Sequence, residues 1–210
     1  MKSVKAVIGV GLAILGFCLA VWAVANVPRI MDQVAVWTYT PSDTIARYAD
    51  ATTMTDDGKH LFYASRPEIL DQAEFDRQCE IEDDVSAIGC YRPDFLTIFI
   101  VDLPAEFDDV EETTAAHELL HAVWDRMNTD ERRAMTVLIE AEAERLATDE
   151  RFVWALSAYD GVPDVSMPNE LHSILGSEFS DLSPELEAHY ALYFADRDAL
   201  VALTEPFGPE

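Results

Sequence analysis

The stretch AAHELLHAVWD, residues 115–125, contains the pattern His-Glu-x-x-His and no helix breaker. Residues four apart lie on one face of an α-helix, so His117 and His121 are expected to project side by side. Two imidazoles in this arrangement can bind one Zn²⁺, and Glu118 then lies where it can take a proton from a metal-bound water. The alanine, leucine and valine neighbours indicate a buried helix. The stretch therefore predicts a core helix that carries a metal site and a general base.

The alternative is a solvated helix with two surface histidines. In a chain of this composition, chance alone produces the His-Glu-x-x-His pattern in roughly one or two per cent of cases. Two of the chain's 5 histidines fall in this motif, and its neighbours are apolar rather than charged. We therefore favour the metal site.

The same stretch resembles the active-site helix of zincin-class zinc metallopeptidases. It is especially similar to the His-Glu-x-x-His-Ala-Val-x-Asp run of thermolysin-like gluzincins. The resemblance implies that His117 and His121 are zinc ligands and that Glu118 is the catalytic base. Metzincins match less well, because they continue with a glycine and a third histidine. The resemblance covers residues 115–125 only, so it implies a zincin-like domain and not the whole thermolysin fold.

Zinc needs a third protein ligand and an open position for water. Gluzincins take this ligand from a glutamate on a later helix, often within Asn-Glu-x-x-Ser/Ala-Asp. The stretch NELHSI, residues 169–174, matches at Asn169, Glu170 and Ser173. It departs at Ile174, where the family has an aspartate that supports a ligand histidine. The resemblance therefore implies Glu170 as the third ligand and leaves the supporting role unfilled.

Other assignments for this region stay open. Glu178 shares a helix face with Glu170 but lies two turns further on, about 12 Å away, so both cannot bind one zinc. His172 is close in sequence but points to another face. Glu170 is also explained as a helix N-terminal acid that interacts with the helix dipole. Asp125, one turn after His121, is a weak candidate for the missing support.

Peptide hydrolysis also needs a hydrogen-bond donor for the oxyanion. A predicted helix over residues 183–203 offers several groups, of which His189, Tyr193 and Arg197 repeat every four residues and share one face. Gluzincins often use a downstream tyrosine or histidine for this role. The candidates are Tyr190 and His189, and the alternative is that both aromatic rings are core residues.

The N-terminus carries an unbroken apolar run over residues 6–25, preceded by Lys2 and Lys5. About 20 apolar residues can cross a bilayer as a helix, and positive charge before them favours a cytoplasmic N-terminus. We predict an anchor over residues 1–27 and an extracytoplasmic domain over 28–210, at the cell membrane.

A cleaved signal peptide is the alternative, because Ala23-Val24-Ala25 fits a cleavage site. The apolar run is longer than a usual signal core, which favours the anchor. Export in either form agrees with Cys79 and Cys90, an even pair in the exported part. We expect a disulfide there that contributes roughly 2–3 kcal/mol, with two free thiols as the alternative.

Composition limits the partners. The 210 residues carry a formal net charge of −26 and are 50% apolar, which suits one domain with a core. Phosphate would be repelled, so we expect no nucleic-acid partner. The acidity is explained by a solvated surface, or alternatively by a preference for basic partners.

The remaining pattern predicts an α+β fold that is mostly α, in which a small N-terminal part with strands follows one transmembrane helix. A turn leading into a strand is expected within 54–65, and a strand over 94–103 that either pairs with extended substrate or lies buried at the centre of a sheet. We expect Thr129 to be an N-cap, with Arg132 where a capping-box glutamate would stand. Helices are expected over residues 41–50, 66–79, 108–128, 129–148, 149–163 (ended by Asp160-Gly161), 167–179 and 183–203.

These features together predict a zinc-dependent metallopeptidase, membrane-anchored or secreted, that hydrolyses protein or peptide substrates with Glu118 as general base. One alternative is a non-catalytic anchored interaction domain whose zinc is structural or vestigial. Another is a zinc hydrolase that acts on something other than peptides, such as cell-wall links.

Overall fold

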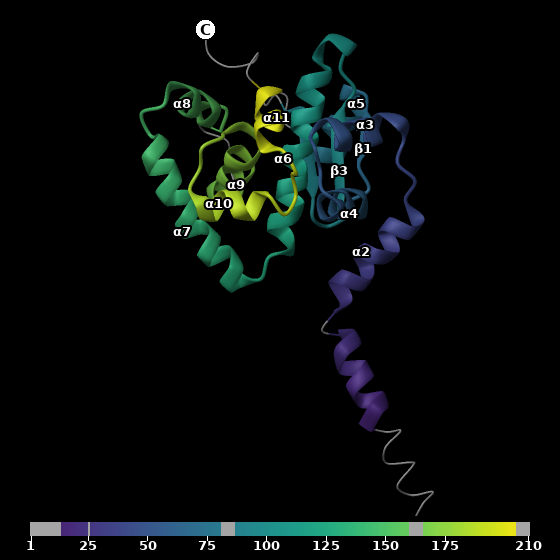
Figure 1. The fold of residues 1–210 in the computed structure, drawn as a ribbon. Coiled ribbons are helices and arrows are strands. Elements are labelled where there is room, and N and C mark those ends of the chain that lie inside the picture. The colour runs from purple at the N-terminus through teal and green to yellow at the C-terminus, as the bar shows by residue number, and fades with distance from the viewer. Residues whose placement is uncertain (1–13, 25, 81–86, 160–165, 205–210) are drawn as a thin grey trace, which may run out of the picture.

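Helix α6 (Asp108–Arg126) runs through the middle of the molecule, between a small sheet and a group of later helices (Figure 1). Its alanines and leucines at 115, 116, 119, 120 and 122 are fully buried. Three acids in its first turn interact favourably with the positive end of the helix dipole. The predicted core helix over 108–128 is therefore confirmed to within two residues.

The computed structural model describes residues 14–24, 26–80, 87–159 and 166–204. It is 69% helical with one three-stranded sheet, which confirms the α+β, mostly α class. The strands are β1 (Glu68–Leu70), β2 (Gly89–Arg92) and β3 (Thr97–Val101). Besides the N-terminal helix Ile14–Val24, the helices are α2 (Val27–Thr38), α3 (Asp43–Ala51), α4 (Asp56–Ala64), α5 (Gln72–Cys79), the 3₁₀ turn η1 (Ala105–Phe107), α6, α7 (Thr129–Leu146), α8 (Glu150–Ser157), α9 (Met167–Glu178), α10 (Pro184–Tyr190) and α11 (Arg197–Ala202).

The sheet has the order β1-β3-β2, with β1 parallel and β2 antiparallel to β3. All five residues of β3 are buried. Ile98 and Ile100 belong to the main core with α6, whereas Phe99 and Val101 pack with Phe75 of α5 on the other face. Because β3 is central, the prediction that it pairs with substrate is wrong and the buried alternative holds. Strand β2 is an edge strand of the sheet and contacts α6.

The segment 54–65 forms helix α4 rather than a turn and a strand. Thr55 caps the helix by accepting from the backbone N–H of Gly58, and two aspartates occupy the first turn. A Cβ on Gly58 would lie 2.3 Å from the backbone oxygen of Tyr193, so this glycine permits close packing and does not form a hairpin turn.

The helix predicted over 66–79 is also partly wrong. Glu68–Leu70 pairs with β3 as strand β1, and α5 begins only after Asp71, whose side chain accepts from the N–H of Glu74. The short strand is stabilised by its neighbour in the sheet, which local sequence does not reveal. Cys79 at the end of α5 forms a disulfide with Cys90 of β2, as predicted.

The N-cap of α7 lies one residue earlier than predicted. The side chain of Asn128 accepts from the N–H groups of Asp130 and Glu131, and the Glu131 carboxylate accepts from the N–H of Asn128. This is a complete capping box, so the assignments of Thr129 and Arg132 are wrong. Helix α8 ends at Ser157, and the predicted Asp160-Gly161 terminator lies outside the described residues.

The helix predicted over 183–203 is two helices, α10 and α11. Between them, Phe194 forms a β-bridge with Met54, and the N–H of Ala195 donates to the carbonyl of Thr53. Asp196 then caps α11. The predicted shared face of His189, Tyr193 and Arg197 therefore does not exist, because the chain between them is not helical.

No single described helix is long and apolar enough to cross a membrane. The helix Ile14–Val24 and α2 meet that length and composition together, with a bend of 71° between them. The start of the predicted apolar run, up to residue 13, lies outside the described residues.

Candidate metal centre

Helices α6 and α9 form the two walls of the candidate site. Gly176 of α9 allows their close approach, since a Cβ there would lie 2.4 Å from Leu120 of α6 and 2.5 Å from the ring of Tyr190. The middle of α9 is buried from Leu171 to Ser177, and Glu170 precedes this stretch. Close packing of the two helices brings the Glu170 carboxylate to the two histidines of α6.

Three side chains converge with the spacing that a metal requires. The Nε2 atoms of His117 and His121 lie 3.1 Å apart, and Oε2 of Glu170 lies 3.7 Å and 3.4 Å from them, respectively. In a tetrahedral zinc site with bonds near 2.05 Å, ligand atoms are separated by about 3.3–3.4 Å. The donor set and its geometry therefore fit Zn²⁺. Within the described ranges, these three residues form the one group that brings at least three such donors within 4.8 Å of one another.

The alternative third ligands do not join this group. His172 is fully buried, and its Nε2 lies 2.9 Å from Nε2 of His189. Glu178 stands at the far end of α9, two turns beyond Glu170. Burial raises the pKa of Glu178, although the charge of His117 opposes this. Of the three candidates, Glu170 alone lies beside both histidines.

The pKa values of the trio His117, His121 and Glu170 indicate an ion pair between a protonated His121 and an ionised Glu170. Burial lowers the pKa of His121, but the hydrogen bond that its N–H donates to Glu170 and the charges of Glu118 and Glu170 outweigh it and raise the pKa to about 9. Burial likewise opposes ionisation of Glu170, yet the two histidines hold its pKa well below the ordinary range. A cation is thus strongly favoured at this position, whether it is a proton on His121 or a metal ion.

Glu118 lies beside the trio under the edge strand β2. It is 5% exposed, and burial raises the pKa of its carboxyl while the two histidines lower it. Within the described part of the chain, its Oε2 has no hydrogen-bond partner. A Cβ on Gly89 of β2 would lie 2.7 Å from Oε1 of Glu118. The carboxyl therefore has a free oxygen and a basicity raised by burial, as a general base requires.

Asn169 is the best candidate for supporting His121. The Asn169 side chain, acting as a hydrogen-bond acceptor, helps to raise the pKa of His121. His121 Nδ1 and Asn169 Oδ1 are both buried, and neither has a hydrogen-bond partner within normal limits of distance and angle among the described residues. An Nδ1–H directed at the amide oxygen would leave Nε2 free for a metal. Asp125, the earlier candidate, instead accepts from the Tyr91 hydroxyl at 3.0 Å and lies 3.6 Å from Arg132.

The two predicted oxyanion donors lie elsewhere. Tyr190 is fully buried, and its hydroxyl donates to the carbonyl oxygen of His172 at 2.9 Å. His189 is half-buried, and burial lowers its pKa to about 4. Its ring packs against Tyr190 and Tyr193, and one of the two facing nitrogens of His189 and His172 donates to the other. The Tyr190 hydroxyl is thus bonded to a backbone carbonyl, and the described contacts of His189 are with His172, Tyr190 and Tyr193.

Tyr159 is the residue at this site that the sequence did not point to. It follows α8 and is partly buried against the main core. Burial raises the pKa of its hydroxyl, and the charges of Glu170 and Glu118 together with a hydrogen bond to Glu170 raise it further. Burial and the two carboxylates thus keep this hydroxyl neutral. The only local signal was an aromatic residue at the end of a predicted helix.

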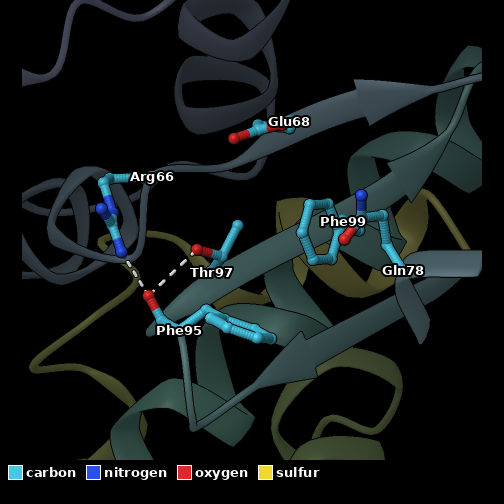
Figure 2. A pocket seen from close by; sticks show the side chains of 6 residues that line it. All are labelled: Arg66, Glu68, Gln78, Phe95, Thr97 and Phe99. Atoms are coloured by element: carbon cyan, nitrogen blue, oxygen red, sulfur yellow. Dashed lines mark hydrogen bonds between the residues drawn. The ribbon is translucent and has the colours of Figure 1, made fainter. Parts of the chain in front are cut away.

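A surface hollow lies on the other side of the sheet. It has a volume of about 310 Å³ and is lined by Arg66, Glu68, Gln78, Phe95, Thr97 and Phe99 (Figure 2). Phe99 belongs to the face of β3 that packs with α5, away from α6. Inside the hollow, Thr97 and Arg66 both donate to the carbonyl of Phe95. It has no part in the candidate metal centre.

Comparison with known proteins gives no relative of this chain. No family model, curated protein or solved structure matches it.

Proposed function

We propose that this chain is a zinc-dependent metallopeptidase of the zincin class, with His117, His121 and Glu170 as the zinc ligands. The observation that carries the proposal is the near-tetrahedral spacing of three donor atoms beside a buried carboxyl that has a free oxygen. Zinc bound there would polarise the scissile carbonyl and lower the pKa of its bound water. The resemblance of residues 115–125 to gluzincins points to the same chemistry.

Glu118 is the general base in this proposal. Its raised pKa suits it to accept a proton from the attacking water and later to give it to the leaving amine. The Tyr159 hydroxyl, which the carboxylates of Glu170 and Glu118 help to keep neutral, is our candidate donor to the oxyanion. It replaces Tyr190 and His189 in that role.

The edge strand β2 supports a peptide substrate over the alternatives. It lies directly above Glu118 through Gly89, and its side away from β3 is free of strand pairing within the described sheet. An extended peptide can add to such an edge by main-chain hydrogen bonds.

A structural zinc site is the second alternative. Such sites are closed by four protein ligands, whereas catalytic sites keep one position for water. In the described part of the chain, the group that could hold a metal has three members. Three protein ligands leave a fourth position for water, which favours a catalytic zinc site over a structural one.

We further propose that the domain acts outside the cytoplasm and is attached to a membrane by the N-terminal helix. The support is the apolar character of residues 6–25 and the Cys79–Cys90 disulfide, which suits an oxidising compartment. No nucleic-acid partner is expected from the net charge of −26.

The test is metal content and peptidase activity of the full chain, purified in detergent and loaded with zinc. We expect one zinc per chain, loss of bound zinc in His121→Ala, and retained zinc with at least 100-fold lower activity in Glu118→Gln. Glu140→Gln, an exposed glutamate on α7, is the matched control and should behave like the parent chain. A chain that binds no zinc contradicts the proposed site, and full activity in Glu118→Gln contradicts the proposed mechanism.

A further inference from the structure

Helix α2 presents an apolar face to solvent. At 3.6 residues per turn, its five exposed apolar side chains fall within an arc of about 120° around the helix. Their exposed fractions run from 40% for Ile30 to 76% for Trp37, and the other three are Val27, Met31 and Val34. A stripe of this length on one face is typical of a helix that lies against an apolar partner.

The opposite face of α2 is fixed to the domain. Asp32 is 8% exposed and accepts two hydrogen bonds from Arg126, at 2.7 Å from Nη2 and 3.0 Å from Nε. Separating such a buried pair leaves an uncompensated charge and is strongly unfavourable. Helix α2 therefore cannot roll to bury its apolar stripe against its own domain.

The chain that precedes α2 indicates which partner covers the stripe. The N-terminal helix Ile14–Val24 is also exposed and apolar, with Phe17 71% and Trp22 59% exposed. It points away from the domain and precedes α2 in the chain, with a bend of 71° between the two helices (Figure 1). One bilayer accommodates both helices, the first within the acyl region and the second along its surface. Trp37 then lies at the interface, where tryptophan is enriched.

Charge argues for apolar insertion rather than electrostatic attraction. The chain carries a net charge of −26, so anionic lipids would repel it. The charged residues of α2 are Arg29 and Asp32, and the latter is buried in its ion pair. The stripe itself contains neither charge.

We infer that α2 lies in the interface of a lipid bilayer and holds the domain at a fixed height through the Asp32–Arg126 pair. Arg126 is five residues beyond His121 on α6, about 7.5 Å along the helix axis, so the candidate metal centre lies close to the membrane surface. The placement of α2 rests on the proposed membrane attachment alone, whereas its consequence for the substrate rests also on the proposed peptidase activity. It favours substrates that are peptide segments near a membrane surface.

The test places an environment-sensitive fluorophore at single cysteines of the full chain in phosphatidylcholine vesicles, with the disulfide kept oxidised. The native free thiol of Cys18 reports on the N-terminal helix. In a Cys18→Ser background, Val34→Cys and Trp37→Cys report on the stripe, and Glu140→Cys on α7 is the exposed control. We expect nitroxide-labelled lipids to quench the probes at 18, 34 and 37, and aqueous iodide to quench only the probe at 140.

Three results would overturn the inference, and they are distinguishable. Iodide quenching at 34 and 37 with lipid quenching at 18 shows that the anchor inserts and α2 stays in water. Protection from both quenchers at 34 and 37, with disulfide cross-linking between chains, shows that a second copy covers the stripe. Iodide quenching at all positions shows that the membrane attachment itself is wrong, whatever the zinc and activity measurements give.

Discussion

At the residue scale, we expect His121 to bind either a proton or the proposed zinc ion, but not both. Its raised pKa favours a protonated ring paired with Glu170 in the metal-free chain, and zinc binding would require the loss of that proton. We expect the Asn169 side chain to accept from the other ring nitrogen and so to favour the ring orientation that both forms need. The pH dependence of the metal-free and zinc-bound forms therefore has opposite signs.

We expect the metal-free protein to lose stability as the pH rises from 7 to 9.5. The pKa of His121 is raised to about 9 in the folded chain, against 6.5 for the free side chain. Its contribution is thus fully present below pH 6.5 and is lost as the pH rises through 9. Histidines whose pKa is lowered in the folded chain, such as His189, change charge at lower pH and so contribute little to the pH dependence of stability between pH 7 and 9.5. Zinc affinity should rise over the same range, because binding no longer displaces the proton.

The measurement is the free energy of unfolding by denaturant at pH 7, 8 and 9.5, after chelator treatment and again with saturating zinc. His121→Gln is the control, and it should remove most of the pH dependence of the metal-free form. Equal pH dependence with and without zinc would contradict the proposed exchange of a proton for a metal at this residue.

The predictability of the site differs from residue to residue. His117, Glu118 and His121 were visible because their relation is local: a fixed spacing on one helix. Glu170 needed a resemblance, since the distance between helices cannot be read from spacing. Asn169 and Tyr159 act through contacts between elements, and no local pattern reveals such contacts.

At the element scale, the edge strand β2 and helix α6 are in close contact at Gly89. A Cβ at this position would lie 2.3 Å from Cγ2 of Thr114 and 2.7 Å from Oε1 of Glu118. Both neighbours belong to α6, so the glycine determines how closely the strand approaches the proposed base. Substitutions at this contact can therefore separate an effect on stability from an effect on peptidase activity.

We expect Gly89→Ala to reduce both stability and peptidase activity, the stability by roughly 1–3 kcal/mol as in other overpacked cores. Adding Thr114→Ser removes the Cγ2 atom, so the double variant should regain much of the stability. Its activity should stay low, because the clash with Glu118 remains. Thermal unfolding and peptide hydrolysis of the two variants and of Thr114→Ser alone provide the comparison. Parallel recovery of stability and activity would contradict a direct effect on Glu118.

The elements themselves were predictable where their signals are local. Helices α3, α6, α7 and α9 follow from caps, proline positions and apolar spacing. The errors occur where a distant segment decides the conformation. Segment 68–70 is a strand because β3 pairs with it, and the break after α10 exists because residues 194–196 contact 53 and 54. Asp-Asp-Gly at 56–58 reads equally well as a turn or a first helical turn, and packing against Tyr193 selects the helix.

At the scale of the whole molecule, repulsion among the acidic residues that give the net charge of −26 lowers the stability of the folded chain. The 40 acidic residues outnumber the 14 basic ones, and among the described residues the ion pairs with lysine or arginine involve ten of the acids. Repulsion between like charges at a surface acts over distances that salt screens, with a Debye length near 10 Å at 0.1 M. Folding concentrates these charges, so the folded chain is affected more than the unfolded one.

We therefore expect the free energy of unfolding of the zinc-loaded protein to rise with sodium chloride from 10 mM to about 0.3 M, where the Debye length is near 6 Å. The increase should level off above this range, because screening of neighbouring surface charges is then nearly complete. Denaturation by urea, which adds no ions, is the suitable measurement. Choline chloride, at equal ionic strength, is the control for specific sodium binding to the acidic surface. Stability that falls with both salts would show that attractive ion pairs, such as Arg126–Asp32 and Arg47–Glu112, outweigh the net repulsion.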